Sequence, residues 1–168
     1  MKSLVVYDSL TGNTEKIAEV VYDAISFDKD ICKANENFSL EKYDLIAIGY
    51  WVNKGICSDK IKKIIENTHN KNIILFGTLG ANDSGDYYES IKKRIEELIP
   101  ADNKVLGHFL CQGKINEGLT ERYKEMLRKN PEDEHIKEQL KNHEEASRHP
   151  NNDDLENAKM FVEKFVLK

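Results

Sequence analysis

The chain has 168 residues, of which 39% are hydrophobic and 33% are charged, and its formal net charge is -5. A chain of this length suffices for one domain with an ordinary core, and its frequent aliphatic clusters argue against disorder. The negative charge argues against a protein that coats nucleic acid or an anionic membrane, because both partners require clustered lysine and arginine.

The cysteines and the apolar runs indicate the compartment. Cys32, Cys57 and Cys111 form no CxxC pair and are odd in number, so neither a disulfide framework nor a four-thiolate zinc site is predicted. The first apolar run ends at Asp8, and no run reaches the roughly 18 apolar residues of a membrane-spanning helix. We therefore expect a protein of the reducing cytoplasm that contacts neither membrane nor nucleic acid.

Short aliphatic runs alternate with helical patterns along most of the chain. The predicted strands are residues 4–7, 30–34, 45–48, 72–76 and 105–110, and the predicted helices between and after them are 17–25, 61–65, 88–99 and 155–166. This alternation predicts an α/β domain over residues 1–168, built from βαβ units around a parallel sheet. The run at 30–34 is weak and the run at 105–110 contains Gly107 and His108, so both are predicted edge strands.

Residues 116–152 interrupt the alternation before the last helix. They contain two charged amphipathic patterns, near 119–127 and 136–143, and Pro131 between them is predicted to begin the second helix. The apolar stripes are thin, so we expect a helical insertion that lies loosely against the body of the domain.

The segment SLTGNT follows the first predicted strand and leads into a helix. Ser9, Thr11 and Thr14 offer hydroxyl groups, Asn13 offers an amide, and Gly12 allows close backbone approach to an anion at the helix N-terminus. The loop lacks the lysine of a Walker loop and the GxGxxG of a dinucleotide site, which favours a monophosphate. The alternative is an ordinary helix cap made by Thr11 or Asn13.

This loop resembles the phosphate loop of flavodoxins, T/S-x-T-G-x-T, and the order of predicted elements from Lys2 to Lys168 is compatible with that fold. The resemblance implies a flavodoxin-like, doubly wound, five-stranded parallel sheet in the order 2-1-3-4-5, which puts the two weak strands at the edges. It also implies FMN as the cofactor, with its phosphate bound by the loop. The implied phosphate-binding residues are Ser9, Thr11, Gly12, Asn13 and Thr14.

In flavodoxins the flavin ring lies between the loops after strands three and four, here residues 49–57 and 77–88. The residues implied in the two loops are Tyr50, Trp51, Val52 and Gly55, and Thr78, Leu79, Gly80, Asp83 and Tyr87. Trp51 lies earlier in its loop than the usual stacking tryptophan, so it is interpreted either as a stacking residue or as a structural anchor. Tyr88 shares a helical stripe with Ile91 and is predicted to be buried, which leaves Tyr87 for the flavin.

Four lysines lie in or just after the first loop, namely Lys54, Lys60, Lys62 and Lys63. Cations near a flavin favour its anionic reduced form, which predicts a less extreme low potential or a partner with an acidic docking face. The alternative is a solvated helix face. The insertion at 116–152 is a candidate docking surface or lid for the flavin edge.

The stretches WVNKG and LCQGKI resemble a flavodoxin-like group associated with bilin reduction, which implies electron delivery to a partner such as a bilin reductase. Gln112 or Lys114 is a candidate contact to the ring or the partner, unless Gly113 simply sets the strand end. The main expectation is an FMN-binding electron carrier. The alternatives are an FMN-dependent reductase of a quinone, bilin or similar acceptor, and a protein-binding module without FMN.

No catalytic residue and no metal ligand is predicted. His135, His143 and His149 lack ligand spacing and are interpreted as solvated helix residues. Cys57 and Cys111 lack any sequence sign of an activating base.

Overall fold

The computed structural model describes residues 1–166. Its strands are β1 (Ser3–Tyr7), β2 (Lys29–Lys33), β3 (Leu45–Trp51), β4 (Asn72–Leu79) and β5 (Lys104–Gln112). Its helices are α1 (Asn13–Ala24), α2 (Asp59–Glu66), α3 (Gly85–Glu96), α4 (Glu117–Lys129), α5 (Glu134–Ala146) and α6 (Asn152–Val166). All predicted elements are present, and β3 and β4 run about three residues further than their apolar runs.

The five strands form one parallel sheet in the order β2-β1-β3-β4-β5, which confirms the predicted topology and both edge strands. In the register of the sheet, Tyr7 lies opposite Gly49, Trp51 opposite Thr78, and Leu79 opposite Gln112. The carboxyl ends of the strands therefore meet at one edge, where the loops that follow β1, β3, β4 and β5 come together.

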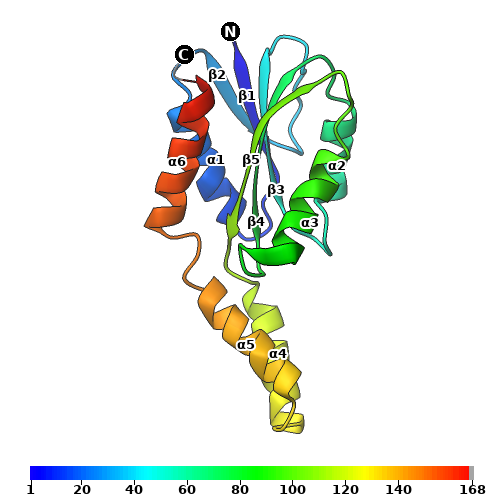
Figure 1. Ribbon diagram of the computed structural model, residues 1–168, viewed down its shortest axis with the longest axis vertical. Helices are drawn as coiled ribbons and strands as arrows, with labels where there is room; N and C mark the ends of the chain where they lie inside the picture. The colour runs from blue at the N-terminus through cyan, green and yellow to red at the C-terminus, as the bar shows by residue number, and fades with distance from the viewer. Residues whose placement is uncertain (167–168) are drawn as a thin grey trace.

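Both faces of the sheet are covered by helices, because side chains alternate between the faces along each strand (Figure 1). Val5 and Ala47 pack with Ile17 of α1 and Val162 of α6 on one face. On the other face, the cluster includes Val6 and Ile48 of the sheet with helical residues Ile61, Ile65, Ile91 and Ile95. These two layers produce a doubly wound α/β fold. Within residues 1–166, no helix has both the length and the apolar character needed to cross a bilayer.

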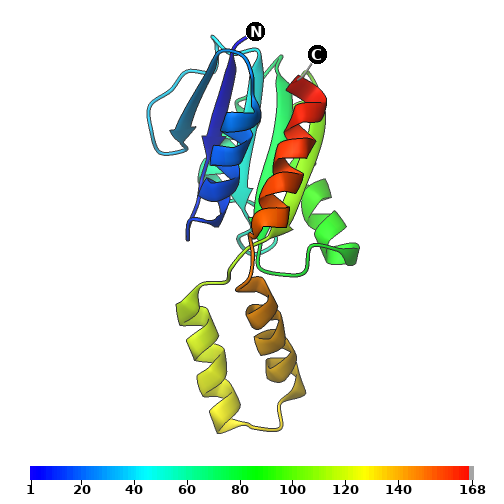
Figure 2. The ribbon, with the colours of Figure 1, turned by 90° about the vertical axis from the view of Figure 1, so that its left-hand side faces the viewer.

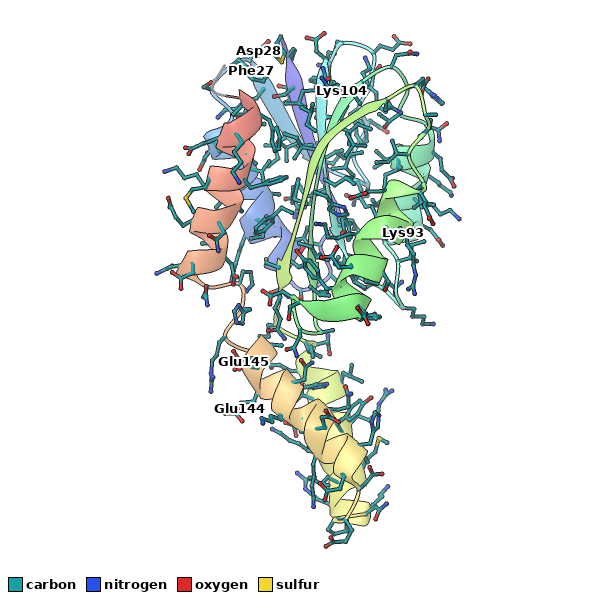
Figure 3. All side chains as sticks on the ribbon, in the orientation of Figure 1. Phe27, Asp28, Lys93, Lys104, Glu144 and Glu145 are labelled. Atoms are coloured by element: carbon teal, nitrogen blue, oxygen red, sulfur yellow. The ribbon has the colours of Figure 1, made fainter. Side chains whose placement is uncertain are left out.

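The insertion forms an antiparallel hairpin of α4 and α5 that projects beyond the carboxyl edge of the sheet (Figure 2). The expectation that it would lie against the body holds only at its base. The second helix begins at Glu134 and not at Pro131, because the carboxylate of Asp133 caps it by accepting a hydrogen bond from the N–H of Ile136 at 3.1 Å. Figure 3 shows Phe27, Asp28 and Lys104 at the end of the body remote from the hairpin, and Glu144 and Glu145 on α5 near its base.

Candidate cofactor site

A cavity of about 360 Å³ lies where the loops of the carboxyl edge meet the base of the hairpin. It brings together nine of the residues that the sequence singles out. They are Ser9, Thr11, Asn13, Thr14, Trp51, Val52, Thr78, Leu79 and Gly80. Its position is the crevice outside the carboxyl ends of the strands where open α/β sheets bind ligands, and its volume lies in the range of small-molecule sites, about 300–1,000 Å³.

The loop after β1 exposes backbone donors at the start of α1. Gly12 occupies the N-cap position with a left-handed φ of 89°, and its N–H donates to Ser9 Oγ at 3.1 Å. Within residues 1–166, no side chain caps this helix, and the N–H groups of Asn13 and Thr14 have no hydrogen-bond acceptor. The alternative of a helix cap made by Thr11 or Asn13 is therefore wrong, and the free N–H groups with the helix dipole leave an anion site.

Two of the predicted phosphate donors direct their side chains into the protein. Thr14 is 1% exposed, and its Oγ1 lies 2.9 Å from Thr78 Oγ1 and 3.4 Å from the carbonyl oxygen of Tyr50. Asn13 Nδ2 donates to the carbonyl oxygen of Lys114 at 2.8 Å. Gly113 permits this approach, because a Cβ there would lie 2.8 Å from Asn13 Nδ2. These side-chain contacts join the loop to β3, β4 and the segment after β5, while the backbone N–H groups of both residues have no acceptor among residues 1–166.

Trp51 lines the cavity, and the N–H group of its indole ring is held by a hydrogen bond. Its Nε1 donates to Asp8 Oδ2 at 3.0 Å, and Ser58 Oγ donates to the same oxygen at 2.7 Å. Asp8 thus joins the loops after β1 and β3. The indole is half-buried, so Trp51 is an anchor whose ring also forms part of the cavity wall.

Tyr50, one of the residues implied for the ring site, does not line the cavity. The side chain is fully buried and its hydroxyl lies 2.6 Å from His108 Nε2, while His108 Nδ1 lies 2.8 Å from Glu96 Oε1. Burial lowers the pKa of His108 to about 4, against the opposing effect of Glu96. The neutral imidazole therefore donates from Nδ1 to Glu96 and accepts at Nε2 from Tyr50. Only the carbonyl group of Tyr50 reaches the site, through Thr14.

Three further predicted residues lie outside the cavity lining. Gly55 has a φ of 84°, and its carbonyl oxygen accepts a hydrogen bond from Arg94 Nη1 of α3 at 3.0 Å. Asp83 is exposed. Tyr87 is 49% exposed and lines a separate cavity of about 880 Å³ between the loop after β4 and α5.

Tyr88 is half-buried and its hydroxyl donates to the carbonyl oxygen of Leu110 at 3.0 Å, which agrees with the prediction that it packs against the body. Gln112 is buried and braces the strand ends, because its Nε2 donates to the carbonyl oxygen of Gly80 at 3.2 Å and to Asn142 Oδ1 at 3.3 Å. Lys114 Nζ pairs with Glu117 at 2.6 Å. The end of β5 therefore joins the cavity to the hairpin.

The cations near the loop after β3 are partly offset by carboxylates. Lys60 Nζ lies 3.8 Å from Asp8 Oδ1, and Lys62 Nζ lies 3.9 Å from Glu66 Oε1. The Lys62–Glu66 pair is exposed and contributes little to stability, and in both pairs the carboxylate partly neutralises the lysine charge.

Comparison with known proteins identifies the family. Residues 4–163 match the model of the flavodoxin domain. The chain is 52% identical over 172 residues to a flavodoxin-like domain-containing protein BilS from Clostridioides difficile, covering 100% of this chain and 98% of the relative. It is 30% identical to a second BilS protein, from Clostridium symbiosum, covering 96% and 94%.

This chain belongs to the flavodoxin family. Among solved structures, a flavodoxin from the domain Archaea has the same fold, with a TM-score of 0.61 at 18% identity, covering 99% of this chain and 97% of the other. The family is one of FMN-binding flavoproteins, and the cavity has the donors that such a cofactor requires. Free backbone N–H groups at one end suit a phosphate, and Trp51, Val52 and Leu79 provide apolar wall for a planar ring.

The sequence predicted the insertion as a docking surface or lid for the flavin edge, but it did not show which of its side chains line the cavity. Five cavity-lining residues come from it, namely Leu119, Tyr123, Gln139, Asn142 and His143. The spacing of Leu119 and Tyr123 predicted a helical stripe, but no local pattern shows which surface that stripe meets. The prediction that His143 is solvated is wrong, because the base of the hairpin leaves it 6% exposed.

The remaining histidines of the predicted set have other surroundings. His135 is exposed, and His149 Nδ1 lies 2.7 Å from Asp154 Oδ2. In the part of the chain that the structure describes, no group of three or more His, Cys, Asp or Glu side chains is arranged to hold a metal ion.

Proposed function

We propose that this flavodoxin-family protein binds FMN in the cavity at the carboxyl edge of the sheet and carries electrons to a partner reductase. The observation that carries the proposal is the juxtaposition of the free N–H groups of Asn13 and Thr14 with the indole of Trp51 around one cavity. An anion site beside an aromatic wall matches a ligand that has both a phosphate and a flat ring.

We assign two kinds of role to the residues of the loop after β1: some donate hydrogen bonds to the phosphate, and others hold the loop in place. The hydroxyl groups of Ser9 and Thr11 remain able to donate to a phosphate, since each accepts a hydrogen bond within the loop, from Gly12 N and Asn13 Nδ2 respectively. Gly12 keeps the loop in the left-handed turn that presents its N–H groups. The side chains of Asn13 and Thr14 hold the loop against the sheet.

The remaining proposed residues enclose the ring. Trp51, Val52 and Leu79 exclude water from the ring faces, while Thr78 and Gly80 contribute polar groups at the strand ends. Bound FMN would supply transfer of one or two electrons, and the protein orients it and sets its potential through nearby charges and hydrogen bonds. For Tyr50, Gly55, Asp83 and Tyr87 we propose supporting roles outside direct ring contact.

A bilin reductase is the partner we propose, on the strength of the resemblance of WVNKG and LCQGKI to the flavodoxin-like group associated with bilin reduction. The resemblance in sequence to two BilS relatives over nearly the whole chain supports a shared role among the three proteins. We place this exchange in the cytoplasm, whose reducing conditions match the free thiols of Cys32, Cys57 and Cys111.

One observation favours a second candidate, an FMN-dependent reductase that acts directly on a quinone or bilin. The cavity of about 880 Å³ beside α5 shares Ala81, Gln139 and Asn142 with the cofactor cavity, so a small acceptor bound there would lie next to the flavin site.

Titration with FMN tests the binding step. Flavin fluorescence should be quenched on binding to the wild type, and Ser9→Ala/Thr11→Ala should weaken FMN binding by about 100-fold or more, since hydrogen bonds to a charged group contribute about 1.5–3 kcal/mol each. Ser39→Ala, an exposed serine remote from the cavity, is the matched control. A protein that takes up no FMN would instead support the protein-binding module.

Anaerobic reoxidation separates carrier from enzyme. The FMN-loaded, reduced protein should transfer electrons rapidly only when a bilin reductase is present together with its bilin. Equally rapid reoxidation by the bilin or a quinone alone would refute the carrier and support the direct reductase.

A further inference from the structure

His143 is the buried side chain of the hairpin that the proposed roles leave unused. It lies on α5, is 6% exposed, and borders both the cofactor cavity and a second cavity of about 510 Å³. The ring therefore forms part of the wall between the two cavities. The contacts of its two nitrogens indicate which nitrogen faces which cavity.

The contacts of the imidazole fix its orientation. Nδ1 lies 2.8 Å from the hydroxyl of Thr120, which lines the second cavity. The ring packs against Tyr123, with centroids 5.2 Å apart and planes at 52°, and Tyr123 lines the cofactor cavity. The two nitrogens of an imidazole point in nearly opposite directions. Because Nδ1 is engaged by a residue of the second cavity and His143 also lines the cofactor cavity, we assign Nε2 to the side of the cofactor cavity.

Nε2 has no partner of its own among residues 1–166. Every fully buried side-chain nitrogen or oxygen in this range has a hydrogen-bond partner, so Nε2, which has none, is not completely buried. The neighbouring polar side chain Asn142 is already engaged, since its Nδ2 donates to the carbonyl oxygen of Gly80 at 2.9 Å and its Oδ1 accepts from Gln112. His143 is therefore the hairpin side chain with a free ring nitrogen at this wall.

The protonation state follows from the surroundings. Burial lowers the pKa of His143, which keeps the ring neutral near pH 7. The Thr120 hydroxyl lies 2.8 Å from Nδ1 and 3.5 Å from the carbonyl oxygen of Asn116, and either Thr120 or Nδ1 can be the donor in the shorter contact. With Thr120 as the donor to Nδ1, the ring proton resides on Nε2.

We propose that the Nε2–H group of His143 donates a hydrogen bond to an acceptor atom of the flavin ring system, so that the hairpin supplies both a wall and a polar contact of the cofactor site. This inference rests on the proposed FMN binding. Ring acceptors become more negative when the flavin is reduced, so the contact is stronger in the reduced protein than in the oxidised one. The hairpin thereby raises the potential of the cofactor as well as its affinity.

Three substitutions at one position separate the roles of the two nitrogens. His143→Gln places an amide nitrogen near the position of Nε2, His143→Asn places one near Nδ1, and His143→Ala removes both. We expect the Asn and Ala variants to bind oxidised FMN about three- to tenfold more weakly, the loss of one hydrogen bond, and to have a more negative midpoint potential. The Gln variant should bind within about twofold of the wild type. His135→Ala, an exposed histidine on the same helix, is the control.

Long-range proton–nitrogen NMR of the histidine ring gives a readout independent of electron transfer. The protein without FMN should show His143 in the Nε2–H form, and addition of FMN should shift that signal. Melting temperatures without FMN report whether a variant merely unfolds the hairpin. Two results would refute this inference while leaving the proposed function intact. In the first, the wild type binds FMN and His143→Ala has the same affinity and midpoint potential; in the second, the Nε2 signal does not shift when FMN is added. Absence of FMN uptake by the wild type would refute both it and the proposed function.

Discussion

Replacing Thr14 with valine tests whether the start of α1 is attached to the sheet through one buried pair of hydroxyl groups. The Oγ1 atoms of Thr14 and Thr78 lie 2.9 Å apart, and the two residues are 1% and 3% exposed. Valine keeps the shape of threonine but removes the hydroxyl, so Thr78 would be left in the core without this partner. The N–H of residue 14 is unaffected by the change.

The magnitude follows from that lost contact. A buried hydroxyl without a partner costs about 1–3 kcal/mol, so Thr14→Val should lower the free energy of unfolding by that amount. For a chain of this size each kcal/mol shifts the melting temperature by about 2–4 °C, giving a decrease of about 2–12 °C. In Thr14→Val/Thr78→Val neither hydroxyl remains, and the double variant should lose less stability than the sum of the two single variants.

Urea unfolding of the protein without FMN measures these differences, with Thr11→Val as the control. Thr11 is exposed in the same loop, so its replacement should change stability by less than about 0.5 kcal/mol. FMN affinity should fall much less in Thr14→Val than in Ser9→Ala/Thr11→Ala. Unchanged stability of Thr14→Val, or strictly additive effects in the double variant, would show that the hydroxyl pair does not hold the helix start.

Three further outcomes follow from the packing around the site. Gly55→Ala should lower stability by about 1–2 kcal/mol in thermal unfolding, because Gly55 has a φ of 84° and a new Cβ would lie 2.7 Å from Arg94 Nη1; a melting temperature equal to that of the wild type would contradict this. The free energy of unfolding should fall as the pH drops from about 6.5 to about 4. The pKa of His108 is about 4 in the folded protein and about 6.5 in the unfolded chain, so in this pH range the unfolded chain binds a proton that the folded protein does not, and the proton stabilises the unfolded state. His108→Gln should flatten the urea-unfolding free energy over that window, and an unchanged slope would count against it. Burial raises the pKa of all three cysteine thiols, so a disulfide reagent at pH 8 should react slowly with the native protein and rapidly with three thiols after unfolding; fast reaction of native thiols would show that they are accessible.

The sequence by itself determined that helices cover both faces of a parallel sheet, because the apolar patterns of strands and helices are local. A run such as Leu45–Ile48 is apolar without interruption only if both faces of its strand are covered, and the stripe through Ile91 and Ile95 fixes which side of its helix is buried. The segment SLTGNT predicted an anion site for the same reason, since the free N–H groups at a helix start are a property of the helix itself.

Only the tertiary structure decided which of those groups face the cavity. Thr14 and Asn13 carry the right donors, yet contacts with Thr78 and Lys114, far away in the sequence, already engage both side chains. His143 was predicted to be solvated, yet it is buried at the base of the hairpin, where the Thr120 hydroxyl contacts its Nδ1. Hydrophobic periodicity records which residues are buried, whereas the identity of their neighbours depends on strand register and on long-range contacts that no single stretch of sequence contains.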